Sequence, residues 1–215
     1  MGNGAAVYEY LVRWAHYAGG VMWLGSLFYL NFIQSEYLRV ATPDARADNV
    51  RKLMPNLLLW FRYSSLLTLF TGCVVLAIRW GNAGLAGWNL YMSLGSLLGI
   101  ILFINIWTVT IPCWQISLGR ASGDSARASA RLNLAARTNL LFSGPMLFFM
   151  GASSHLPSPS IVDVEVSTFV SLGFLVGLLE LNGLVGRLGP LASPGGAAAC
   201  SIALTFVMVL LSNTL

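Results

Sequence analysis

The sequence predicts an all-α integral membrane protein, a bundle of about six transmembrane helices. Of its 215 residues, 56% are apolar and only 9% are charged, and the mean hydropathy is +0.72. Because these charges are too few to cover a water-soluble surface, we expect the lipid bilayer to be the solvent of this protein. The apolar stretches are joined by short loops, which predicts a single transmembrane domain over residues 1–215.

Six apolar stretches approach the roughly 20 residues that a helix needs to cross a membrane. They cover residues 11–33, 53–78, 88–111, 134–152, 166–185 and 197–211. Two of them are weaker candidates. Residues 125–137, ahead of the fourth stretch, are amphipathic and suit an interfacial helix, and the sixth begins at a flexible Ser-Pro-Gly-Gly. Five spans therefore stay open as an alternative to six. The first stretch lacks the features of a removed signal peptide, so we expect it to remain as a helix.

Cationic residues gather in alternate loops. The second loop holds only Arg79 and the fourth holds none. Because cations in short loops stay in the cytoplasm, the pattern predicts cytoplasmic odd-numbered loops and periplasmic chain ends. The same pattern explains the formal charge of +4 without a basic face for nucleic acid. The cations of the first, third and fifth loops are Arg39, Arg46, Arg51, Lys52, Arg120, Arg127, Arg131, Arg137 and Arg187.

Ionisable groups within a span are costly, which makes each of them a functional candidate. The densest group is Glu9, Arg13 and His16, which share one helical face, with Gly19 and Gly20 one turn beyond. This pattern suits a b-type haem: His16 would bind the iron, the macrocycle would lie on the glycines, and Arg13 would bind a propionate. The alternative is that the glycines admit another helix and that His16 bonds a neighbouring backbone or hydroxyl group.

The other histidine, His155, follows the fourth stretch on the same predicted side of the membrane as His16. It is therefore a candidate second haem ligand, and the alternative is a loop histidine at the interface. Met146 and Met150 could supply a thioether, although methionines at helical spacing more often pack. The sequence shows no serine, histidine and carboxylate set, phosphate loop or zinc motif, so catalytic residues stay unassigned and an enzymatic function stays open.

Further polar residues lie within the predicted spans. Arg62 could pair with Glu180, or it could extend to lipid headgroups beside the interfacial Tyr63. Asn105 and Asn139 are expected to bridge helices by hydrogen bonds.

Several short motifs follow one another within residues 10–157. They are Arg13-Trp14-Ala15-His16 with Trp23, Gly25 and Phe28-Tyr29; Trp60-Phe61-Arg62-Tyr63 with Thr68 and Gly72; Asn105 with Pro112; and Asn139 with Pro145, Met150 and His155. In this order and spacing they resemble the membrane domain of the PuuD-type membrane-bound urate oxidases (urate hydroxylases). The resemblance implies an all-helical domain of the bacterial inner membrane, followed here by two further helices over residues 158–215. In that family a C-terminal cytochrome c domain takes the electrons from urate oxidation.

The chain also departs from this family. It lacks the cytochrome c domain and its Cys-x-x-Cys-His site, and it is shorter between the second and third spans. Where further family histidines are expected, it has Ser93 and either Ala136 or Arg137, which leaves only His16 and His155. Urate oxidation therefore cannot simply be transferred to this chain.

Two functions are compatible with these observations. The first is a redox subunit that holds haem b near the outer face and passes electrons to a periplasmic cytochrome c. The second is a non-catalytic accessory subunit of a larger respiratory or photosynthetic membrane complex, whose lipid-facing sides bind partner helices. The retained histidines favour the first, and the missing histidines and the many helical glycines favour the second. The departures disfavour a third possibility, a urate oxidase that works with a separate cytochrome.

Overall fold

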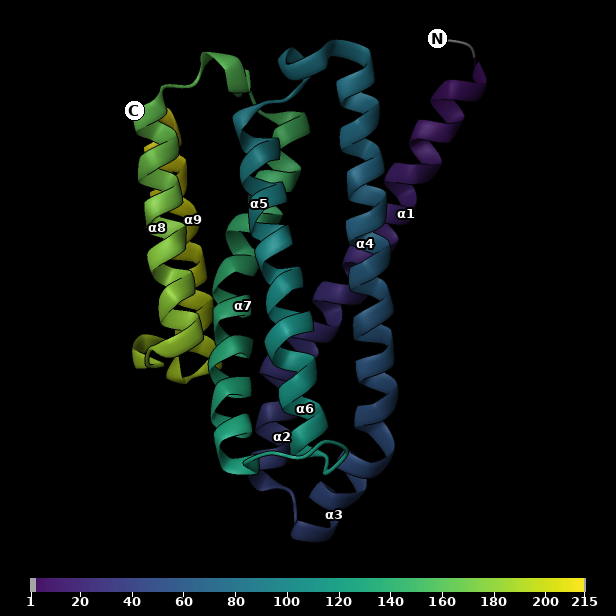
Figure 1. Cartoon of the computed structure of the whole chain (residues 1–215), viewed down its shortest axis with the longest axis vertical. Helices are drawn as coiled ribbons and strands as arrows, with labels where there is room; N and C mark the ends of the chain where they lie inside the picture. The colour runs from purple at the N-terminus through teal and green to yellow at the C-terminus, as the bar shows by residue number, and fades with distance from the viewer. Residues whose placement is uncertain (1–2, 215) are drawn as a thin grey trace.

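The computed structural model describes residues 3–214, and within that range it contains long helices and no β-strand, which confirms the all-α prediction (Figure 1). The chain makes six helical passes. In chain order these are α1 (Asn3–Phe28) with the π-helical turn η1 (Tyr29–Gln34) and α2 (Ser35–Val40); α3 (Pro43–Asp48) with η2 (Asn49–Leu53) and α4 (Met54–Ala83); α5 (Leu90–Asn105) with η4 (Ile106–Thr110) and α6 (Ile111–Ser117); α7 (Ser125–His155); α8 (Val166–Val185); and α9 (Pro194–Thr214).

The passes run alternately up and down, so both chain ends lie at one end of the bundle (Figure 1). We call this the terminal end, and it also carries the 3-10 turns η3 (Gly84–Gly87) and η5 (Ile161–Asp163). The opposite end carries α2, α3 and the loop after α6, and we call it the cationic end. The 3-10 turn η6 (Gly189–Ala192) lies toward the same end, where the shorter α8 and α9 meet. The odd-numbered loops therefore gather at one end, as their charge pattern requires.

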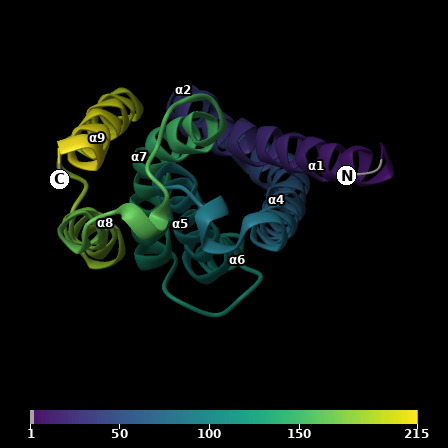
Figure 2. The ribbon, with the colours of Figure 1, turned by 90° about the horizontal axis from the view of Figure 1, so that it is seen from above.

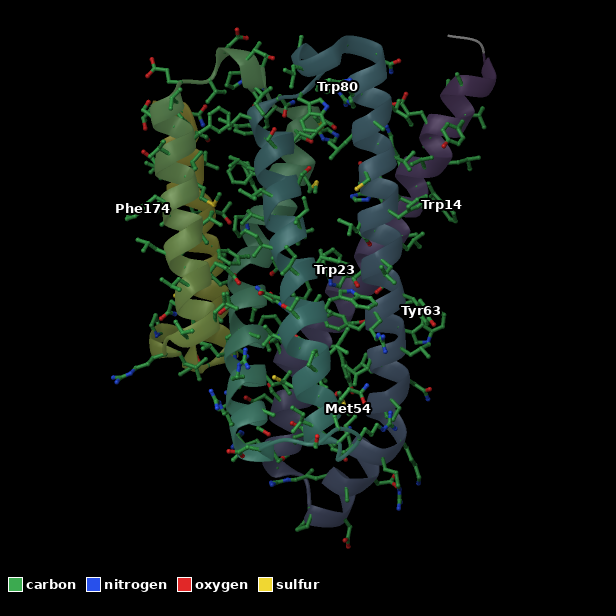
Figure 3. All side chains as sticks on the ribbon, viewed as in Figure 1. Trp14, Trp23, Met54, Tyr63, Trp80 and Phe174 are labelled. Atoms are coloured by element: carbon green, nitrogen blue, oxygen red, sulfur yellow. The ribbon has the colours of Figure 1, made fainter. Side chains whose placement is uncertain are left out.

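Within residues 3–214, four helical segments are long and apolar enough to cross a membrane, which agrees with the predicted membrane protein. They are Pro43–Gly87, Leu90–Ser117, Val166–Val185 and Pro194–Thr214. The helices α1 and α7 contain 26 and 31 residues, enough length for a span, and they lie in the same bundle. Phe174 and Trp14 point outward from the bundle (Figure 3), as expected of side chains solvated by lipid.

The fourth pass differs from its predicted extent. α7 begins at Ser125 and continues without a break to His155, so residues 125–137 belong to the bundle and do not form a separate interfacial helix. Its first turns bury Ala128 and Ala135 against Val109 and Cys113 of the third pass. Because the small residues form a stripe at helical spacing, a segment of low hydropathy still packs tightly.

The pair α5 and α7 forms the centre of the bundle, with α1 and α4 on one side and α8 and α9 on the other (Figure 2). Leu98 and Leu102 of α5 and Phe142 and Phe149 of α7 are fully buried. Gly95 permits the close approach, because a Cβ at this position would lie 3.0 Å from the backbone nitrogen of Met150. In lipid this tight packing replaces the hydrophobic effect as the main attraction between helices.

We expect Gly95→Ala to lower thermal stability by roughly 1–3 kcal/mol, because the added methyl group presses on the rigid backbone of α7. Gly25→Ala is the matched control, since Gly25 lies in a helix with no atom within 4 Å of the added Cβ. The measurement is the midpoint of thermal unfolding of both variants in mild detergent. Equal midpoints would show that α5 and α7 do not approach as described.

Candidate functional site

His16, the predicted haem ligand, lies in the contact between α1 and α4 and is half-buried. Its Nδ1 donates to the backbone oxygen of Thr68 at 2.9 Å, and the Oγ1 of Thr71 lies 3.3 Å away. A carbonyl oxygen only accepts, so Nδ1 carries the proton and Nε2 is left with its lone pair. Gly72 makes room for the ring, because a Cβ there would lie 3.1 Å from Cε1 of His16.

The glycines beside His16 are in contact with α4. A Cβ on Gly19 would lie 2.8 Å from Oγ1 of Thr68, and one on Gly20 would lie 4.0 Å from its Cγ2. Arg13 donates through Nε to Glu9 at 3.0 Å, one turn earlier on the same helix. These contacts match the second of the two predictions for this segment, in which the glycines admit a neighbouring helix. At Gly19, α4 occupies the space that the haem macrocycle would need.

The fold does not bring His155 to His16. His155 is the exposed last residue of α7 at the terminal end, and its Nδ1 bonds the oxygen of Gly151 in its own helix at 2.9 Å. Met146 and Met150 pack against α5. Among residues 3–214, no three histidine, cysteine, aspartate or glutamate side chains are grouped to hold a metal ion. Of the predicted haem ligands, only His16 is therefore left as a candidate. Haem binding itself stays a prediction.

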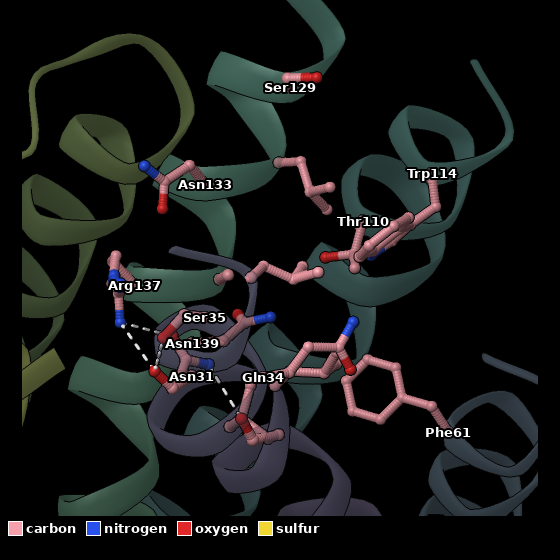
Figure 4. Close-up of a pocket in the computed structure, with 15 residues that line it drawn as sticks. Asn31, Gln34, Ser35, Phe61, Thr110, Trp114, Ser129, Asn133, Arg137 and Asn139 are labelled. Carbon is pink, nitrogen blue, oxygen red and sulfur yellow. Dashed lines mark hydrogen bonds between the residues drawn. The ribbon is translucent and has the colours of Figure 1, made fainter. Parts of the chain in front are cut away.

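A second set of residues lines a pocket in the half of the bundle toward the cationic end, with polar side chains set in a mostly apolar wall (Figure 4). We call it the Arg137 pocket. It has a volume of about 180 Å³ and lies between η1, α4, the third pass and α7, with Phe61 and Trp114 among its apolar walls. Its polar lining residues are Asn31, Gln34, Ser35, Thr110, Ser129, Asn133, Arg137 and Asn139.

Among the described residues that line this pocket, Arg137 carries the charge. Its side chain is only 7% exposed. Nη1 donates to Oδ1 of Asn31 at 3.1 Å and to the backbone oxygen of Asn31 at 3.5 Å, whereas Nε has no partner (Figure 4). None of the ion pairs formed by the described residues includes Arg137. Glu36 attracts Arg137 from a distance, but its ion pair is with Arg39. A buried cation without a carboxylate in ion-pair contact costs several kcal/mol, which marks this position as a functional candidate.

Two acceptor atoms in the same pocket also lack partners. Gln34 is 2% exposed and Thr110 is 4% exposed, and neither Oε1 of Gln34 nor Oγ1 of Thr110 makes a hydrogen bond. The other amide atom of Gln34 is occupied, because Nε2 donates to Oδ1 of Asn49 at 3.2 Å. Buried atoms without partners cost about 1–3 kcal/mol each. Three of them belong to residues that line one pocket, which makes this pocket a candidate ligand site.

The pocket is shaped by two π-helical turns. η1 carries Asn31 and Gln34, and η4 ends at Thr110. Each turn has a local cause: Asn31 and Ser35 bond backbone oxygens of their own helix, and Pro112, two residues beyond η4, has no N–H for the helical ladder. Such turns widen a helix and recur at functional sites.

A hydrogen-bonded chain connects the pocket to α8. Asn105 donates through Nδ2 to Oδ1 of Asn139 and to Oε2 of Glu180, each at 3.1 Å. Asn105 and Asn139 therefore bridge helices, as the sequence predicted. Glu180 is bound by Asn105 and forms no ion pair with Arg62, so the suggested Arg62–Glu180 pair is not present.

Comparisons of the chain with protein-family models, curated proteins and solved structures find no match. The fold and the pocket define a class, a polytopic helical membrane protein with a pocket that is lined by a buried arginine. Its function has to be derived from the chemistry of that cavity.

We expect Asn31→Leu to lower the free energy of unfolding by roughly 1–3 kcal/mol, because it removes the partner of a buried guanidinium. The double variant Asn31→Leu/Arg137→Met should recover most of this loss, since both polar groups are then replaced by apolar ones. Denaturant titration in mild detergent measures both values. A double variant less stable than the single variant would show that Arg137 stabilises the bundle itself.

Proposed function

We propose that this membrane protein binds a small organic anion in the Arg137 pocket. The observation that carries the proposal is the buried guanidinium of Arg137, which bonds an asparagine but no carboxylate. A guanidinium recognises a carboxylate or a delocalised anion through paired hydrogen bonds. An anion at this position would supply the charge that the protein leaves unpaired.

The remaining walls narrow the class of ligand. Gln34 and Thr110 offer polar atoms without partners, and Phe61 and Trp114 contribute aromatic surface. This combination suits a planar anion that carries several donors and acceptors. Urate has these properties, and the resemblance to the PuuD-type oxidases implies it as well. We therefore infer a PuuD-like membrane subunit that binds urate or a similar heterocyclic anion.

The orientation of the bundle is part of the proposal. Ser129 and Asn133 are exposed lining residues on the early turns of α7, so the mouth faces the cationic end. By the distribution of cations, that end is cytoplasmic and both chain ends are periplasmic, in a bacterial inner membrane. The loop arginines around the mouth would also attract anions from the cytoplasm.

Electron transfer is the second candidate function, and the geometry of His16 favours it. An imidazole whose Nδ1–H is held by a backbone oxygen presents Nε2 in a fixed direction, as iron-binding histidines do. A haem b held there would supply one-electron chemistry toward a periplasmic cytochrome c. Gly19 and Arg13 would have to change their present contacts to form the rest of that site. The accessory-subunit function would gain support if neither an anion nor a haem binds.

We expect the wild-type protein in mild detergent to bind urate, and we expect Arg137→Gln to weaken the affinity by roughly 10- to 100-fold, because a charge-assisted pair is lost. Isothermal titration calorimetry measures both. Arg187→Gln, which removes an exposed arginine that does not line the pocket, is the control and should bind as the wild type does. Hypoxanthine, a neutral heterocycle of similar shape, should bind weakly. Equal affinities for the two heterocycles would refute recognition of charge.

The haem candidate predicts a b-type band in the reduced-minus-oxidised spectrum of the purified protein. His16→Ala should abolish that band and leave the thermal midpoint within a few degrees, whereas His155→Ala should retain it, because His155 lies on a separate helix end. The pyridine haemochrome assay gives the haem content per chain. If a folded sample contains no haem and takes up none on addition, the redox function is excluded.

A further inference from the structure

A second pocket lies between α4 and the third pass, and it is independent of the Arg137 pocket. It has a volume of about 230 Å³ and is lined by two arginines from different elements, Arg62 of α4 and Arg120 of the loop after α6. Gln115 adds a neutral polar group, and Leu58 and Leu59 form apolar walls. None of the described residues that line this pocket carries a carboxylate.

Arg62 is held in place by an aromatic ring. Its guanidinium carbon lies 5.1 Å from the centre of the Trp107 ring, within the range of a cation–π contact. The ring is fixed in turn, because Nε1 of Trp107 donates to Oγ of Ser65 at 3.3 Å. Among the described residues, the acidic partners Glu9, Glu36 and Asp48 pair with other cations, so Arg62 and Arg120 keep their donors for a ligand.

The pocket lies at a depth that suits a lipid headgroup. Arg62 is eight positions after Met54, where α4 begins, so it lies about 12 Å along the helix axis. Arg120 lies at the cationic end itself. Tyr63 points outward beside the pocket (Figure 3) and is 62% exposed, as expected at a membrane interface.

The surface beyond Arg62 is apolar and uncovered. Leu66 and Phe70 follow Arg62 at intervals of four residues, so the three side chains share one face of α4. Both are exposed, Phe70 to 69%. A ligand bound at Arg62 can therefore extend an apolar chain along α4 toward the middle of the bilayer.

We propose that this pocket binds an anionic phospholipid, with Arg62 and Arg120 on the phosphate oxygens and an acyl chain along Leu66 and Phe70. Basic pockets between helices at the cytoplasmic side of a membrane bind such headgroups. The continuous apolar face identifies the source of the phosphate as a lipid, because free phosphate would gain nothing from it.

Native mass spectrometry of the detergent-purified full chain tests this site. Equal amounts of phosphatidylglycerol and phosphatidylcholine are added, and the bound populations are compared. We expect the wild type to prefer phosphatidylglycerol by about 25-fold, roughly fivefold for each arginine, and the double variant Arg62→Gln/Arg120→Gln to lose that preference. Arg187→Gln, which removes an exposed cation from another loop at the same end, should retain it.

The proposal would be overturned if the wild type showed no lipid preference, or if the double variant kept the preference of the wild type. It would also be overturned if excess inorganic phosphate displaced the lipid, because the pocket would then be a site for free phosphate. The single variant Arg120→Gln controls for misfolding of the double variant, because Arg120 is an exposed loop residue whose replacement should not disturb the bundle. This single variant should bind phosphatidylglycerol roughly fivefold less well, consistent with the contribution of one basic residue near a membrane surface. A preference for phosphatidylglycerol unchanged in this variant would count against the site.

Discussion

A polar group inside this bundle has to find its hydrogen-bond partner within the protein, because the surrounding lipid offers none. Most hydroxyl groups on the helices meet this constraint locally, by donating to a backbone oxygen one turn earlier, as Ser26, Thr138 and Thr205 do. Six buried side-chain atoms of the described residues have no partner, and three of them line the Arg137 pocket. Half of these unpartnered atoms therefore belong to residues of one pocket, and this observation is the basis for proposing a binding site there.

The fold was largely predictable because its main determinant is local. Each apolar stretch specifies a helix by its own hydropathy, and the alternation of loop charges specifies which loops share an end. The beginning of α7 was harder to predict, since residues 125–137 have low hydropathy. Their place in the bundle depends on Ala128 and Ala135, which pack against residues of the third pass. Such a contact between segments leaves no signal in the hydropathy of either one.

The candidate site was predictable only in part. The sequence identified His16 and its alternatives, and the bond from His16 to Thr68 is one of those alternatives. It missed the Arg137 pocket, because Arg137 was counted among the loop cations. The contact that buries Arg137 joins it to Asn31, 106 positions earlier in the chain. A local signal did exist: Asn31, Gln34 and Ser35 are polar residues at helical spacing at the end of an apolar stretch.

The π-helical turns at the pocket have a consequence for the evolutionary history of this chain. A π turn holds one residue more than the α-helical turn it replaces, so it can arise by a single-residue insertion that the rest of the helix accommodates. Relatives without this pocket would then align with the chain through a one-residue gap near Asn31 and another near Thr110. The position of these two gaps in a family tree would show whether the pocket arose after the bundle. If the two insertions were always gained or lost together, selection would have acted on both turns as one unit.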